Sequence, residues 1–132
     1  MNWPLWSVLL ACVLPIVCAG IAKSGTFGTP RSRGGYDNHD PRAWLSAQAG
    51  WRARANAAQA NSFEALPLYI AGVFAALYRQ ADPVWVNSLC AAFIALRVAY
   101  IALYVGDRAG ARSVVWVLGF ACAAALFFVP RA

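Results

Sequence analysis

The chain has 132 residues, of which 61% are hydrophobic and only 12% are charged, and its mean hydropathy is +0.55. Soluble domains are about 45–50% apolar and about 25% charged, and a soluble chain of this length has too little interior to bury so much apolar surface. The net charge of +6 does not indicate nucleic-acid binding, because the basic residues lie at the ends of apolar segments and form no aromatic-basic surface of the kind that binds RNA. The composition therefore predicts an integral membrane protein.

Four apolar segments are long enough to span a bilayer, at about 3–22, 44–79, 84–105 and 113–129. The first segment could also be a cleaved signal peptide, but no positive charge precedes its apolar run, and this favours a retained helix. The prediction is a single domain, residues 1–132, folded as an all-α bundle of four transmembrane helices.

Short signals mark where two of these helices begin. Asp40-Pro41 and Asp82-Pro83 each place an Asp at the N-cap and a Pro at the first helical position. From Ala43 the helical pattern continues to Tyr78, which is too long for one simple span. The polar stretch 23–40, rich in Gly, Pro and Arg, is either a solvated connector or a lid over a site at the membrane surface.

Lys and Arg are concentrated in the first and third loops. The positive-inside rule therefore places these loops in the cytoplasm and both termini on the non-cytoplasmic side. The four cysteines lie inside apolar segments, and we expect them to be small buried hydrophobic residues. The only histidine, His39, lies in a polar loop. No metal site is predicted.

Glu64 lies deep within the second predicted span and Arg97 within the third, and both are charged. A lone charge at the centre of a span costs about 2.5–3.5 kcal/mol on insertion scales, and we expect the two side chains to pair across the helices. The pair is either a structural ion pair that fixes the register of the helices in the bundle or part of a functional site.

Further polar residues lie toward the same, cytoplasmic half of the spans. They are Arg54, Gln59, Asn61, Tyr100, Tyr104, Arg108 and Arg112. The tyrosines could be interfacial belt residues, and Arg108 and Arg112 could be loop charges that set the topology. Together the group would form a cationic, hydroxyl-rich pocket open to lipid, suited to a small anionic peptide-like ligand whose carboxylates arginines can bind.

Two motifs at this point resemble a known family. Ala58-Gln59-Ala60-Asn61-Ser62-Phe63-Glu64 with Leu66-Pro67-Leu68 is similar to the second-helix signature of the MAPEG family, the membrane-associated proteins in eicosanoid and glutathione metabolism. Arg97-x-x-Tyr100-x-x-x-Tyr104, followed by Arg108 and Arg112-Ser113, is similar to its third-helix and third-loop signature. The four spans and the long first loop also match, so the resemblance covers nearly the whole chain.

The resemblance implies a homotrimer of four-helix bundles that binds glutathione between subunits near the cytoplasmic face. It implies that the glutathione site is lined by Arg54, Gln59, Asn61, Glu64, Tyr100 and Tyr104, with Arg97 paired to Glu64. Arg108 or Arg112 would stabilise the attacking thiolate, and Lys23 would supply a basic contact at the end of the first helix. A guanidinium lowers a thiol pKa by favouring the charged form.

The implied function is a glutathione-dependent transferase or peroxidase that acts on lipophilic electrophiles or lipid hydroperoxides in the bacterial inner membrane. Glutathione would be its co-substrate, and membrane lipid and copies of itself its partners. Ala57 stands where glutathione-using members carry arginine, and Ala60 where one branch of the family also does, and the chain is similar to the plain bacterial branch. The alternative is therefore a non-catalytic trimer that binds a lipid or a small anionic ligand.

Overall fold

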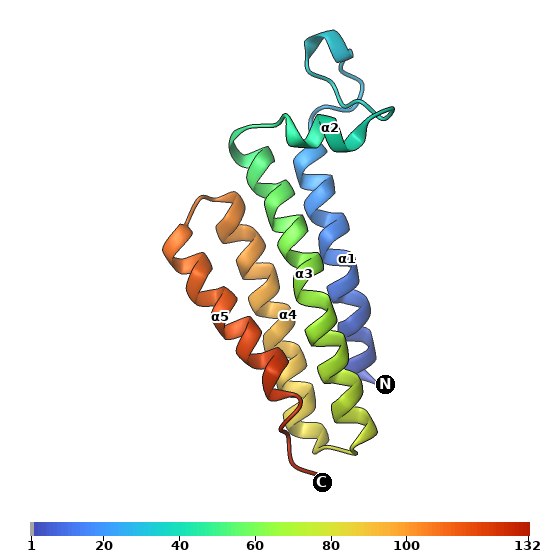
Figure 1. The fold of residues 1–132 in the computed structure, drawn as a ribbon, viewed down its shortest axis with the longest axis vertical. Coiled ribbons are helices and arrows are strands. Elements are labelled where there is room, and N and C mark those ends of the chain that lie inside the picture. Colours follow the sequence, from blue (N-terminus) through green and yellow to red (C-terminus); the bar gives the residue numbers. More distant parts are fainter. Residues whose placement is uncertain (1) are drawn as a thin grey trace.

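The computed structural model describes residues 2–132, so Met1 of the predicted domain lies outside the described residues. Its helices are α1 (Trp3–Lys23), the 3-10 turn η1 (Arg31–Arg33), α2 (Pro41–Ser46), α3 (Gly50–Tyr78), α4 (Pro83–Val105) and α5 (Ala109–Ala125). The four long helices run side by side in alternating directions, and both chain ends lie at the same end of the bundle (Figure 1). The predicted all-α membrane bundle is confirmed for a single chain, and the homotrimer stays a prediction.

Both Asp-Pro pairs begin helices, as predicted. The Asp40 carboxylate accepts a hydrogen bond from the Ala43 amide at 3.1 Å, and the Asp82 carboxylate accepts one from the Val84 amide at 2.8 Å. Each bond satisfies a backbone N–H that the first helical turn leaves without a partner. A proline follows each Asp at a position where no helical hydrogen bond is required.

The continuous helix predicted from Ala43 to Tyr78 is wrong. The structure divides this segment into α2 and α3, with a break at residues 47–49. Gly50, which follows the break, has a φ of +59°, a conformation that glycine adopts far more readily than residues with a Cβ. The break lets α2 lie across the ends of α1 and α3 while α3 runs into the bundle (Figure 1).

The fourth span also departs from its predicted bounds of 113–129. α5 begins earlier, in a first turn in which the Arg112 amide donates to the Arg108 carbonyl at 2.9 Å, and it ends at Ala125 after 17 residues. The chain then crosses to the turn between α3 and α4, where the Asp82 amide donates to the Pro130 carbonyl at 2.9 Å. Because a proline disfavours helical backbone in the residue before it, the helix does not continue to the C-terminus.

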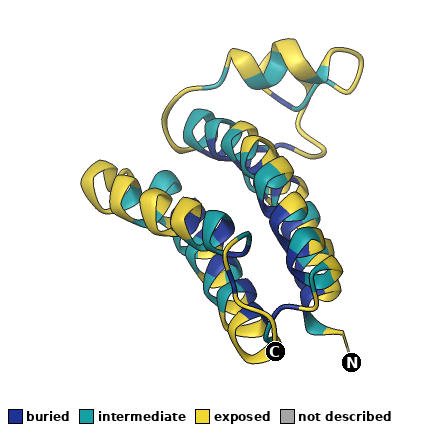
Figure 2. Ribbon diagram, turned by 60° about the horizontal axis from the view of Figure 1, so that its bottom comes forward, coloured by how far each residue is buried: buried dark blue, intermediate teal, exposed yellow. Residues whose placement is uncertain are grey.

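The largest buried cluster lies toward the end that carries the chain termini. Tyr69 of α3 is fully buried, with its ring stacked on Phe93 of α4 at 3.7 Å between centroids and its hydroxyl 2.5 Å from the Ser7 hydroxyl of α1. Gly72 lies so close to α5 that an added Cβ would be 2.8 Å from the Ala123 carbonyl oxygen. Figure 2 shows exposed residues over the start of α5 and the first loop, away from this core.

Apolar side chains also cover much of the outside of the bundle. Ile16 of α1, Phe74 of α3 and Val84 of α4 each expose more than half of their surface. α1, α3 and α4 are long and apolar enough to cross a bilayer, whereas α5 is shorter, with 17 residues. Since lipid tails are as apolar as these side chains, such a surface is suited to a bilayer and not to water. The chain is an integral membrane protein.

Candidate functional site

Arg97 lies within α4 and is buried, with only 4% of its surface exposed. Both terminal nitrogens of its guanidinium donate to Asn61 Oδ1 at 3.1 Å, and Nη2 also donates to Ser62 Oγ at 3.2 Å. The guanidinium carbon lies 4.4 Å from the centroid of the Tyr100 ring, in cation–π contact. A cation inside an apolar span requires such partners, and here its acceptors are two neutral side chains of α3.

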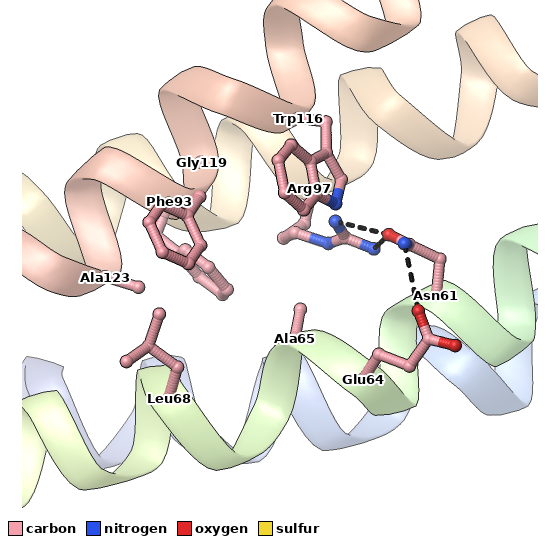
Figure 3. Close-up of a pocket in the computed structure, with 10 residues that line it drawn as sticks. Asn61, Glu64, Ala65, Leu68, Phe93, Arg97, Trp116, Gly119 and Ala123 are labelled. Carbon is pink, nitrogen blue, oxygen red and sulfur yellow. Dashed lines mark hydrogen bonds between the residues drawn. The ribbon is translucent and has the colours of Figure 1, made fainter.

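Glu64 does not contact Arg97 directly, so the predicted ion pair between them is wrong. Asn61 stands between the two side chains, because its Nδ2 donates to Glu64 Oε2 at 3.3 Å while its Oδ1 accepts from Arg97 (Figure 3). Neither of the ion pairs within residues 2–132 involves Glu64 or Arg97. An amide carries a donor and an acceptor, and a residue one turn before Glu64 on the same helix face can reach both groups. We call this arrangement the Arg97–Asn61–Glu64 chain.

A cavity of about 170 Å³ lies next to this chain, between α3, α4 and α5 (Figure 3). One part of its wall is polar, formed by Asn61, Glu64 and Arg97. The rest is apolar and is formed by Ala65, Leu68, Phe93, Trp116, Gly119, Phe120 and Ala123. A small site with a few convergent polar groups and apolar walls is typical of a pocket for an amphipathic ligand.

A second cavity, of about 220 Å³, brings Tyr100 and Arg112 to the same region. It shares Asn61 and Trp116 with the first cavity, so the two adjoin at these side chains. The Arg112 guanidinium carbon lies 4.2 Å from the centroid of the Tyr104 ring, and the Tyr104 ring meets that of Tyr100 edge-on at 5.6 Å. Each tyrosine ring is therefore in contact with one guanidinium. Tyr100 contacts Arg97 deep in the bundle, and Tyr104 contacts Arg112 nearer its end.

The remaining predicted site residues lie outside these two cavities. Arg54 reaches the end of α4, where its Nε donates to the Val105 carbonyl at 3.0 Å and its Nη1 lies 3.8 Å from the Asp107 carboxylate. Gln59 is half-buried on α3, and Arg108 is exposed just before α5. Of the two arginines considered for thiolate stabilisation, the structure brings Arg112 to the cavities and leaves Arg108 at the surface.

Comparison with known proteins places these features in a family. The family model described as "MAPEG family" matches residues 3–132. The chain belongs to the MAPEG family. No curated protein and no solved structure matches the chain. Family membership makes it a membrane protein of the glutathione and eicosanoid metabolism group, as the two motifs predicted.

Two side chains of this MAPEG protein's site were absent from the sequence-based prediction. Ser62 accepts from Arg97 and donates to the Ala58 carbonyl at 2.8 Å. Its position beside Asn61 in the second-helix motif was an available signal. Trp116 lines both cavities from α5, and nothing in the uncharged fourth span distinguishes it from other apolar residues, so only the structure identifies it.

Proposed function

We propose that this MAPEG protein is a glutathione-dependent transferase or peroxidase that acts on lipophilic electrophiles or lipid hydroperoxides. The observation that supports it most is the pair of adjoining cavities, which combine the Arg97–Asn61–Glu64 chain, the Tyr104–Arg112 contact and apolar walls. Such a site offers charged and amide groups for a peptide thiol and apolar surface for a second, lipophilic substrate.

In this proposal Arg112 is the catalytic residue. Its positive guanidinium favours the thiolate form of glutathione, which is the nucleophile. In the transferase reaction the thiolate sulfur forms a bond to the electrophilic carbon, and the leaving group departs with the electron pair. In the peroxidase reaction the sulfur takes the terminal oxygen of the hydroperoxide. The lipid leaves as an alcohol, and a second glutathione then reduces the sulfenic acid, forming the disulfide and water.

The proposed glutathione site extends to Glu64 and to a neighbouring subunit. Glu64 is exposed in the single chain, and Phe63 beside it exposes 52% of its surface. In a homotrimer a neighbouring copy would cover this face of α3, and the glutathione amino group would bind the Glu64 carboxylate in a charge-assisted hydrogen bond. Gln59 and Arg54 would then contribute from the same helix toward the end of the bundle.

The proposed orientation puts the first and third loops in the cytoplasm, with both termini outside, in the bacterial inner membrane. It rests on the asymmetry of Lys and Arg between the two ends of the bundle. Single cysteines introduced into a variant lacking the native ones, at Ser32 in the first loop and at Gln80 in the exposed turn between α3 and α4, test it with a membrane-impermeant thiol reagent on intact cells. Labelling at position 80 alone agrees with the proposal, and labelling at position 32 alone contradicts it.

The activity is tested with purified protein in detergent, given glutathione and either a generic aryl halide or a lipid hydroperoxide. Arg112→Ala is compared with Arg108→Ala, which removes the same charge from an exposed position nearby. We expect Arg112→Ala to lower kcat by about 100-fold, as removal of one electrostatic contact to the reacting atom commonly does, and Arg108→Ala to have little effect. No turnover by the unaltered protein, together with no heat of glutathione binding in calorimetry, contradicts the proposal.

A second candidate function is a non-catalytic trimer that binds a lipid or a small anionic ligand. Ala57 and Ala60 favour it, because a lost charged hydrogen bond weakens binding by about 1.5–3 kcal/mol. It predicts a ligand that co-purifies in the cavities and is unaffected by added glutathione. Displacement of that ligand by glutathione favours the enzyme.

A further inference from the structure

The end of the bundle opposite the chain termini carries most of the charge of the protein. Eight of the 11 basic side chains lie there: Lys23, Arg31, Arg33, Arg42, Arg52, Arg54, Arg108 and Arg112. Only three carboxylates accompany them, those of Asp37, Asp40 and Asp107. The surplus of positive charge at a membrane surface attracts anionic lipid.

Aromatic contacts fold the first loop over this end. The Tyr36 ring meets Phe27 at 5.7 Å and Trp44 of α2 at 5.2 Å between centroids, both edge-on. The Lys23 amine lies 4.4 Å from the centroid of the Tyr36 ring. The Phe27 ring remains 66% exposed, as aromatic side chains at the level of lipid headgroups often are. The cation at the end of α1 is therefore held on a folded surface.

A groove of about 400 Å³ runs between α1 and α4 on the outside of the bundle. Its walls are entirely apolar and include Leu14, Val17 and Ile21 of α1 and Val98, Ala102 and Val105 of α4. An apolar groove on the outside of a membrane bundle has the chemistry for an acyl chain rather than for a polar ligand.

Two cations lie at the end of α1, beyond the last groove residue of that helix, Ile21, and neither lines the groove itself. Lys23 is the last residue of α1, and Arg52 of α3 donates from one nitrogen to the Ala22 and Ser24 carbonyls, at 2.9 and 2.7 Å. Within residues 2–132, neither cation forms an ion pair with a carboxylate. Their charge is therefore available to a phosphate.

We propose that the α1–α4 groove and the two cations at the end of α1 bind one anionic phospholipid. An acyl chain occupies the groove, and the phosphate lies near Lys23 and Arg52. A second copy of this chain is the less suitable occupant, because an apolar helix face fills the groove but leaves both cations without a counter-charge. The groove shares no lining residue with the cavities between α3, α4 and α5 that the proposed glutathione reaction uses, although the family resemblance also gives Lys23 a contact to glutathione.

Native mass spectrometry of the detergent-solubilised protein tests the proposal, with palmitoyl-oleoyl phosphatidylglycerol titrated against the phosphatidylcholine of the same chains. We expect tighter binding of phosphatidylglycerol. Lys23→Gln should weaken it about fivefold, since one cation near the bilayer surface contributes about 1 kcal/mol, and Lys23→Arg should restore it. Ala102→Phe fills the groove and should lower the bound lipid. Ala91→Phe, three turns earlier on the same face of α4 and outside the groove, should not.

Two results overturn the proposal. The first is equal retention of the two lipids, or loss of binding on addition of millimolar glycerol phosphate, since that ion has the headgroup chemistry without an acyl chain. The second is an Ala102→Phe variant that changes the oligomeric state of the protein and leaves lipid binding intact, because the groove is then an interface between copies. Circular dichroism of each variant shows that it is folded, so that reduced binding is not a consequence of unfolding.

Discussion

Asn61→Ala is expected to destabilise the bundle more than any change at Glu64. The substitution removes the oxygen that accepts from both terminal nitrogens of Arg97, and leaves the buried guanidinium with Ser62 Oγ as its acceptor. A hydrogen bond to a charged group contributes about 1.5–3 kcal/mol. Because the two bonds share one oxygen, their contributions do not add fully, and we expect the free energy of unfolding to fall by about 3 kcal/mol.

The measurement is reversible unfolding in mixed micelles as the fraction of denaturing detergent rises, followed by circular dichroism. Glu64→Gln is the matched comparison, because the amide oxygen of Gln still accepts from Asn61 Nδ2 while the charge is removed, so the expected loss is below about 1 kcal/mol. Repeating Asn61→Ala in an Arg97→Met background completes a double-mutant cycle. In the Arg97→Met background, Asn61→Ala should lower the free energy of unfolding by less than about 1 kcal/mol, because Met has no hydrogen-bond donor that the substitution could leave unsatisfied.

Two results would refute this reasoning. If Glu64→Gln costs as much as Asn61→Ala, then a direct ion pair between Glu64 and Arg97 governs the stability. If the effects of Asn61→Ala and Arg97→Met are additive, then the two side chains are not partners.

Two further substitutions test the site and the core. Tyr104→Phe keeps the ring in contact with Arg112 and removes only the hydroxyl, so we expect the melting temperature to be unchanged. The kcat/KM for glutathione should fall about tenfold, which corresponds to the loss of one hydrogen bond of about 1.4 kcal/mol. A lower melting temperature would mean that the hydroxyl contributes to folding. Gly72→Ala should reduce the free energy of unfolding by about 1–3 kcal/mol through overpacking, because its Cβ would lie 2.8 Å from the Ala123 carbonyl oxygen. Gly119→Ala is its control, since the nearest atom is 3.9 Å away, and equal effects of the two would contradict the close approach of α3 and α5.

The features that the sequence predicted well depend on short-range chemistry. The carboxylates of Asp40 and Asp82 cap the helices that follow them, because an N-cap needs only its own next residues. The cost of a charge inside a span predicted correctly that Arg97 has side-chain partners on the second span, although the partner named, Glu64, was wrong. Composition alone was sufficient to predict a membrane protein.

The features that the sequence did not predict depend on side-chain direction and on tertiary contacts. Helical spacing puts Asn61 and Glu64 on one face, but it does not say which of the two reaches across to Arg97. The break before Gly50 was missed because the alanine-rich segment around it has a high helix propensity. Gly50 permits the positive φ of +59° found there, but a glycine alone does not show that the chain bends, and the packing of α2 over the ends of the helices accompanies the bend. Trp116 joins the site because α5 packs over the cavities, which is a property of the whole bundle.

The unequal lengths of the helices have a consequence for the surrounding bilayer. With 17 residues at about 1.5 Å each, α5 spans about 26 Å, a few ångströms less than a hydrocarbon core of about 30 Å. Such hydrophobic mismatch is relieved by local thinning of the bilayer at a cost of a fraction of a kcal/mol per Å. Thinning at the basic end of the bundle brings lipid headgroups closer to Arg112, which lies in the first turn of α5, and shortens the path along this helix from the bilayer surface to the adjoining cavities.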